Sequence, residues 1–157
     1  MKPVLQALVV ADHVYRDGGT GKHIIAGTFN SFKFSRKPTA KQLETPDGTK
    51  KTIVAGGMDS GSPYAYVCLT DVFQGTKFQL QFVNLNKNEV LFGTEAVIQN
   101  VNRLSAIEIA FPLPRLQINE AGVYALEVVW ENEILGSWRI TAEDMDQDSE
   151  RTKNDVG

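Results

Sequence analysis

Short runs of alternating apolar and polar side chains are the feature that most restricts the fold of this chain. Phe78, Leu80 and Phe82 alternate with Gln79 and Gln81, and successive side chains of a β-strand point to opposite faces of the sheet. The same pattern recurs in residues 107–111, 124–130 and 134–140. Turn-forming residues separate the runs, and no segment shows the apolar spacing of an amphipathic helix. We therefore predict an all-β fold: an antiparallel two-sheet β-sandwich, immunoglobulin-like, with about eight strands and little helix.

Residues 120–124, Glu-Ala-Gly-Val-Tyr, refine this prediction. In immunoglobulin-like domains a tyrosine at such a corner donates a hydrogen bond back to the main chain. We expect Tyr124 to make this bond, with Gly122 inside the corner; the alternative is that Tyr124 is one more core aromatic. Trp130 and Trp138 alternate in phase with apolar neighbours, so we expect both in the core.

The Gly-Gly-Thr-Gly-Lys stretch of residues 18–22 resembles a phosphate-binding loop. That motif requires a glycine where Arg16 stands, a serine or threonine where His23 stands, and a helix after the loop. The residues that follow, 24–29, are β-branched, aromatic and glycine-interrupted instead. We predict a β-hairpin turn between extended segments 4–15 and 23–34, and no nucleotide binding.

Residues 35–62 lack sustained periodicity and are expected to form a long loop. Residues 33–51 contain six basic and two acidic side chains, a net charge of +4. Five of these bases are candidate partner-binding residues: Arg36, Lys37, Lys41, Lys50 and Lys51. Neither stacking aromatics nor a recognisable nucleic-acid-binding motif accompanies them. We therefore expect a protein partner and no nucleic acid.

Residues 143–157 contain six acids and two bases, a net charge of −4, whereas the whole chain carries −3. With few large apolar side chains, such a segment cannot bury enough surface to offset the entropy lost on ordering it. We expect one β-sandwich domain over residues 1–142 and a flexible acidic tail over residues 143–157.

A cytoplasmic location is favoured because Cys68 is the only cysteine and no export signal is readable. The longest apolar run, residues 7–11, is too short to span a membrane. Cys68 lies within an apolar segment and is expected to be a buried small hydrophobe.

The two histidines, His13 and His23, stand on the two arms of the first hairpin, with Asp12 beside them. Two imidazoles and a carboxylate can bind a divalent metal if the strand register places them on one face. The register is not readable from the sequence, so these residues are weak metal candidates, and no cofactor is expected. Glu108 and Glu127 fall on outward faces of predicted strands and look solvated.

Three segments together resemble a known family: LVVADHVYRD with TGKHIIAGTF, SPYAYVCLTDV, and AGVYALEVVWENEILGSWRI. They are similar to a bacterial family of all-β domains of unknown function, common in planctomycetes and other environmental bacteria. The similarity covers most of residues 3–142. It implies a compact β domain and supplies no ligand, cofactor or catalytic residue.

Three functions remain open. The leading hypothesis is a non-catalytic module that presents residues 35–62 to another protein or to a second copy of itself. The second is a small metal-binding protein or enzyme that uses Asp12, His13 and His23. The third is a carbohydrate-binding module, because sandwiches often display aromatic side chains to sugars.

Overall fold

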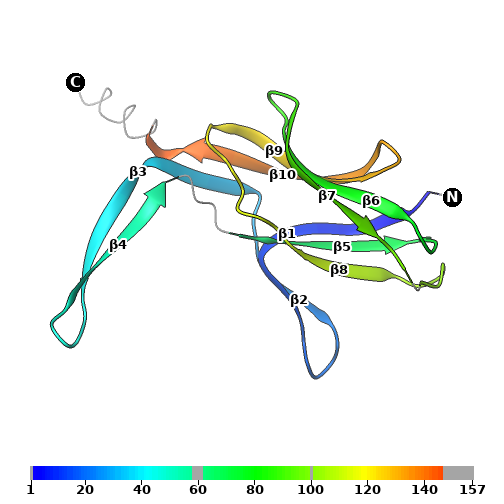
Figure 1. The fold of residues 1–157 in the computed structure, drawn as a ribbon, viewed down its shortest axis with the longest axis horizontal. Coiled ribbons are helices and arrows are strands. Elements are labelled where there is room, and N and C mark those ends of the chain that lie inside the picture. The colour runs from blue at the N-terminus through cyan, green and yellow to red at the C-terminus, as the bar shows by residue number, and fades with distance from the viewer. Residues whose placement is uncertain (1, 58–61, 100, 147–157) are drawn as a thin grey trace.

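The computed structural model describes residues 2–57, 62–99 and 101–146, with the backbone alone for residues 36–43 and 51–57. Its ten strands are β1 (Val4–Arg16), β2 (His23–Thr28), β3 (Ser31–Glu44), β4 (Lys50–Gly57), β5 (Tyr64–Thr70), β6 (Lys77–Asn84), β7 (Glu89–Val97), β8 (Ile107–Pro112), β9 (Gly122–Trp130) and β10 (Glu133–Asp144). One sheet has the order β2-β1-β5-β8, and the other has the order β4-β3-β10-β9-β6-β7 (Figure 1).

The predicted all-β fold with two sheets and little helix is confirmed, since helix is limited to residues 145–146 of the described chain. The strand number exceeds the expected eight. The reason is that residues 35–62, expected to be a loop, contain most of β3 and all of β4. No helix in the described residues is long and apolar enough to cross a membrane.

One pairing departs from the antiparallel prediction. Strands β3 and β10 are parallel over the four pairs from Ser31↔Thr141 to Phe34↔Asp144. The other strand pairs are antiparallel. This parallel pair attaches β3, and with it β4, to the six-stranded sheet.

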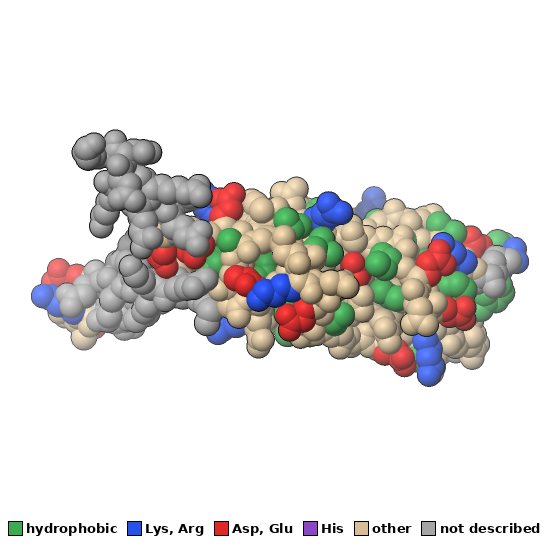
Figure 2. Space-filling model, turned by 90° about the horizontal axis from the view of Figure 1, so that it is seen from above, with side chains coloured by type: hydrophobic (Ala, Val, Ile, Leu, Met, Phe, Trp, Pro, Cys, Tyr) green, Lys and Arg blue, Asp and Glu red, His purple; other side chains and the backbone are tan. Residues whose placement is uncertain are grey.

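The main core lies between the two sheets. Its most deeply buried side chains include Val10, Val67 and Leu69 from the four-stranded sheet, and Phe34, Phe78, Leu80, Phe82, Leu126 and Ile140 from the six-stranded sheet. The residues that alternated in the sequence therefore do face one another, as predicted. Burying each such side chain contributes roughly 1.5–3 kcal/mol. On the outside, Figure 2 shows acidic and basic side chains interspersed along the visible face of the body.

The two tryptophans differ from each other. Trp138 is half-buried, packs against the main core, and its Nε1 donates a hydrogen bond of 2.9 Å to the Phe29 carbonyl oxygen. Trp130, at the end of β9, is also half-buried, but it is not part of that core. The prediction of a core position is therefore wrong for Trp130, because the strand runs past the covered part of the sheet.

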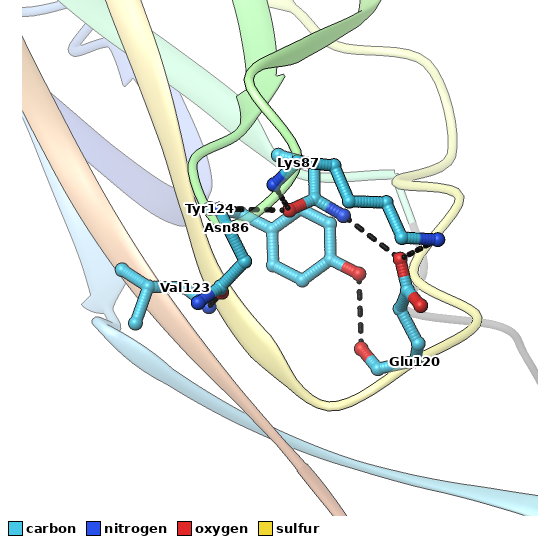
Figure 3. Close-up of polar contacts among 6 residues, drawn as sticks. Asn86, Lys87, Glu120, Val123 and Tyr124 are labelled. Carbon is cyan, nitrogen blue, oxygen red and sulfur yellow. Dashed lines mark hydrogen bonds and ion pairs between the residues drawn. The ribbon is translucent and has the colours of Figure 1, made fainter.

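The predicted tyrosine corner is present at the start of β9 (Figure 3). The Tyr124 hydroxyl donates a hydrogen bond of 2.9 Å to the Glu120 carbonyl oxygen. The Glu120 carboxylate accepts a hydrogen bond from Asn84 Nδ2 and pairs with Lys87 Nζ, both at 2.9 Å. Tyr124 is 1% exposed, and its ring stacks on Phe82 with centroids 5.6 Å apart. Tyr124 is therefore a core aromatic residue, and its hydroxyl also links β9 to the segment that precedes it.

At Gly122, inside this corner, the backbone lies too close to the Asn86 side chain to leave room for a Cβ atom. Its φ is +154°, and a Cβ atom there would lie 2.6 Å from Asn86 Oδ1. That oxygen accepts a hydrogen bond of 2.8 Å from the Val123 amide. The close approach and the positive φ together favour glycine at this position.

Candidate functional site

Strands β3 and β4 form a two-stranded hairpin that projects beyond the two sheets at one end of the molecule (Figure 1). We call residues 35–57 the arm. Its register runs from Ser35↔Gly57 to Glu44↔Lys50, with an irregularity between Ser35 and Thr39. The loop predicted for residues 35–62 is therefore wrong over residues 35–57, which form a hairpin about 30 Å long, at about 3.3 Å per residue.

Side-chain hydrogen bonds fix the tip of the arm. The Asp47 carboxylate accepts from the hydroxyls of Thr45 and Thr49 and from the Thr49 amide. These bonds favour the charged carboxylate and lower the pKa of Asp47 from 3.8 to about 2. Gly48 has a φ of +83° in the turn. The tip is therefore a defined turn with its polar groups paired.

The arm is basic and the rest of the chain is acidic. Its five bases are the predicted partner-binding residues Arg36, Lys37, Lys41, Lys50 and Lys51, and its two acids are Glu44 and Asp47. Five minus two gives the arm +3; because the whole chain carries −3, the remainder carries −6. Lys50 is exposed. The structure places the backbone of the other four bases on the arm and does not describe their side chains.

The predicted boundary after Ala142 falls inside a strand. β10 continues to Asp144, which is 7% exposed. Ser35 Oγ donates a hydrogen bond of 3.0 Å to Asp146 Oδ1, at the base of the arm. Three of the six predicted tail acids, Glu143, Asp144 and Asp146, therefore belong to the folded domain. Residues 147–157, the rest of the predicted tail, lie outside the described residues.

The first hairpin has the predicted form, β1, a turn, then β2. Within the turn the Thr20 amide and hydroxyl donate to Asp17 Oδ2 at 2.9 and 2.7 Å, which lowers the pKa of Asp17. A strand, not a helix, follows the glycines, so the structural context of a phosphate-binding loop is missing.

The register of this hairpin separates the two histidines. His13 pairs with Ala26 and His23 pairs with Arg16. His13 and Arg16 are three positions apart on one strand, so their side chains lie on opposite faces. His13 and Asp12 are exposed, whereas the His23 side chain is only 10% exposed. Nor do the described residues contain a group of three potential metal ligands.

His23 instead joins a cluster that the sequence analysis missed. Its Nδ1 lies 3.5 Å from Glu108 Oε2 on β8, and its ring centroid lies 5.5 Å from that of Tyr66 on β5. The Tyr66 hydroxyl donates a hydrogen bond to Glu108 Oε1. Within the described part of the chain, His23 Nδ1 is buried without a hydrogen-bond partner.

The electrostatics of this cluster hold the carboxylate charged and the phenol neutral. The hydrogen bond from Tyr66, with a smaller contribution from nearby His23, lowers the pKa of Glu108. Burial, and then the same hydrogen bond, raises the pKa of Tyr66. Tyr66 is thus a hydrogen-bond donor and a poor nucleophile.

The cluster sits on a second, smaller core on the outer face of the four-stranded sheet. Ala11, Val14, Tyr66 and Cys68 are buried there. Cys68 is 7% exposed, which confirms the predicted buried position, and its thiol donates to Gln6 Oε1 at 3.7 Å. We regard the role of this region as structural, because it covers the outer face of the four-stranded sheet.

Glu108 is exposed as the alternation suggested, with 44% of its side chain accessible, but Glu127 is not the solvated position that was expected. Glu127 is 7% exposed and accepts a hydrogen bond of 2.7 Å from Gln81 Nε2. It lies on β9, in the six-stranded sheet, whereas Glu108 lies on β8, in the other sheet. Two outward carboxylates on different sheets cannot flank one substrate bond.

Comparison of the chain with models of known protein families and with curated proteins finds no match.

Proposed function

We propose that this protein is a non-catalytic binding or assembly module whose arm contacts an acidic surface of another protein or of a second copy. The observation that carries the proposal is the projection of a basic two-stranded hairpin beyond the sheets of an otherwise acidic chain. No cofactor, nucleotide, nucleic acid or membrane is part of the proposal.

The pairing of the arm supports this function. β10 pairs with β3 only from Ser31 to Phe34, so within the described residues the arm beyond Phe34 pairs only with β4. An isolated two-stranded hairpin is marginally stable in water. A partner strand that adds to either edge of the arm would complete backbone hydrogen bonds and stabilise both proteins.

Charge supplies the preference for an acidic partner. A net charge of +3 on the arm attracts an acidic surface during diffusional encounter and increases the association rate most at low ionic strength. The acidic remainder of the chain repels the same surface. The arm is thus the part of the molecule that such a partner would contact.

The competing metal or enzyme hypothesis has less support, because it required His13 and His23 on one face of the first hairpin. The His23 cluster gives the second histidine a different role, in which it contacts Glu108 and Tyr66.

We also propose an immunoglobulin-like arrangement of the sheets. The order β1-β5-β8 matches strands A, B and E of that fold, and β10-β9-β6-β7 matches G, F, C and C′. The tyrosine corner before β9 supports this proposal. Membership in the bacterial family of unknown function and a reducing cytoplasm as the location are further proposals, the latter supported by the buried free thiol of Cys68.

An arm-trimmed variant tests the function. Ser35 and Gly57 are register partners, so residues 36–56 can be replaced by a short turn that joins them. Affinity capture from the source cells should recover a protein with the full chain and lose it with this variant. A Lys50→Glu, Lys51→Glu variant should weaken capture, whereas the control Lys22→Glu, Arg103→Glu, with equal charge change at exposed sites, should not. Identical captured proteins for all variants would contradict the proposal.

A further inference from the structure

Strand β7 borders the six-stranded sheet on the side opposite β4. Within the described residues it pairs only with β6, so its other edge has no strand partner. Its register with β6 is regular from Phe92 to Val97, and the irregularity of this hairpin lies between Val90 and Phe92. Figure 1 shows β7 in the body of the molecule, apart from the projecting arm. β7 is therefore a regular edge strand over most of its length.

The edges of the four-stranded sheet, β2 and β8, are not open in this way. They turn toward each other across the curled sheet, where His23 Nδ1 lies 3.5 Å from Glu108 Oε2. Among the terminal strands of the two sheets, this leaves β7 and β4 of the arm as the open ones.

The composition of β7 does not protect it against pairing. Natural edge strands are commonly protected by lysine, by proline or by short length. β7 has nine residues, Glu89–Val97, and contains no lysine, arginine or proline. Val90 and Val97 are 56% and 45% exposed. Another strand can add to an edge of this kind.

The two open strands carry opposite charges. β7 contains two exposed acids, Glu89 and Glu95, and no base, a net charge of −2. β4 contains Lys50 and Lys51 and no acid, a net charge of +2. Opposite charges on paired strands stabilise the pair, and like charges destabilise it. Pairing β4 with β7 is therefore favoured over pairing two copies of either strand with each other.

Two lysines of the β6–β7 hairpin lie near these acids without neutralising the edge strand. Lys87, in the turn, pairs with Glu120 at 2.9 Å. Lys77, on β6, lies 3.7 Å from Glu95, and an exposed ion pair of this kind contributes little. The acids of β7 thus remain available to a basic strand.

We propose that β7 of one copy receives β4 of a second copy, so that the six-stranded sheet continues from one molecule into the next. The proposal rests on the proposed function, because it takes the arm as the binding element and names β7 of the same protein as its partner. The contact is head-to-tail, since β4 and β7 are different surfaces. Each open assembly keeps one free β4 and one free β7 and grows beyond a dimer.

Sedimentation velocity measures this self-association directly. At low salt and rising concentration the full chain should form dimers and larger species, and physiological salt should weaken them because it screens both strands. The arm-trimmed variant and the β7 variant Glu89→Lys, Glu95→Lys should each associate at least tenfold more weakly. The matched control is Asp12→Lys, Glu133→Lys, with an equal charge change at exposed positions on β1 and β10, and it should associate like the full chain.

A mixture of the two defective variants separates a head-to-tail contact from a symmetric one. The arm-trimmed variant keeps β7 and the β7 variant keeps the arm, but the lysines of the β7 variant repel that arm in its own copies. An equimolar mixture should therefore form a one-to-one dimer that grows no further. Adding Lys50→Glu and Lys51→Glu to the β7 variant exchanges the charges of the two strands and should restore self-association.

The outcomes separate this inference from the proposed function. A full chain that stays monomeric at low salt would overturn the inference, whereas arm-dependent capture of a different protein would leave the proposed function intact. Unchanged self-association in a β7 variant that circular dichroism shows to be folded would overturn β7 as the receiving strand. If the double change prevents folding, Glu95→Lys alone decides. Unchanged self-association after arm trimming, or a mixture that stays monomeric, would overturn the pairing of β4 with β7.

Discussion

His23 and Glu108 lie on the two edge strands of the four-stranded sheet, and yet His23 Nδ1 is 3.5 Å from Glu108 Oε2. In a flat sheet, three strand spacings would separate those strands by about 14 Å. The sheet is therefore curled, and the two edges meet over the ring of Tyr66. This closure explains why Tyr66 and Cys68 are buried on an outer face.

Glu108→Gln should make the free energy of unfolding less dependent on pH under acidic conditions. The pKa of Glu108 is lowered from its ordinary 4.5, so the charged carboxylate stabilises the fold above pH 4.5, and that contribution is lost as the pH falls through the lowered pKa. Urea unfolding from pH 7 to pH 3 should show a smaller loss of unfolding free energy in the variant. The control is Glu95→Gln, at an exposed position. Parallel profiles for Glu108→Gln and the unsubstituted chain would contradict the role of this cluster.

Tyr124→Phe should reduce the free energy of unfolding by about 1 kcal/mol, because it removes the hydrogen bond to the Glu120 carbonyl oxygen and keeps the buried ring. Chemical denaturation measures this loss. Tyr15→Phe, which removes a hydroxyl from an exposed residue, should leave the midpoint unchanged. If Tyr124→Phe and Tyr15→Phe both have equally small effects, Tyr124 stabilises the corner through the packing of its ring and not through its hydrogen bond.

Gly122→Ala should destabilise the fold by roughly 1–3 kcal/mol, because the new Cβ would approach Asn86 Oδ1 and the backbone would be strained at positive φ. Gly93→Ala is the matched control: it lies on β7, its added Cβ meets only ordinary contacts at 3.8 Å, and its φ is not positive. Thermal melting compares the two. A Gly93→Ala variant that loses more stability than Gly122→Ala would show that the close approach at the corner relaxes readily.

Thr49→Val should raise the pKa of Asp47 from about 2 toward 3.8, because it removes the side-chain hydroxyl that donates to the carboxylate. An NMR titration of the carboxyl carbon measures the shift directly. Thr52→Val, at another threonine of the arm, should leave that pKa unchanged. A pKa near 3.8 in the unsubstituted chain would show that the tip of the arm is open in solution.

A chain that ends at Ala142 should be less stable than one that ends at Asp146. The shorter chain loses the pairs Glu143↔Lys33 and Asp144↔Phe34, together with the Ser35–Asp146 hydrogen bond. Circular dichroism melts of the two chains compare them. Equal melting temperatures would show that the end of β10 does not support the base of the arm.

Alternation predicted the strands that bury one face, and the corner motif predicted Tyr124. The arm was missed because a hairpin that projects from the body need not alternate, and Pro38 with its polar neighbours reads as loop. A signal was nevertheless present: Asp47-Gly48 is a strong turn pair, and it precedes the β-branched residues Thr52, Ile53 and Val54.

The His23 cluster and the position of Trp130 lay beyond sequence reasoning for different reasons. The contact between His23 and Glu108 depends on the curl of a whole sheet, and no local pattern specifies that curl. Alternation assigned Trp130 to a face, but it does not say where the neighbouring strands stop covering that face. The same limit applies to Glu127, which lies on the outward face and is nevertheless buried, with a hydrogen bond from Gln81.

The affinity of the purified captured partner for the full chain and for the arm-trimmed variant is the most direct test of the account, with calorimetry repeated at low and physiological salt. The account predicts that the full chain binds, more tightly at low salt, and that trimming lowers the affinity at least a hundredfold while circular dichroism still shows a folded β domain. Equal affinity of a folded arm-trimmed variant would contradict the claim that the arm is the binding element.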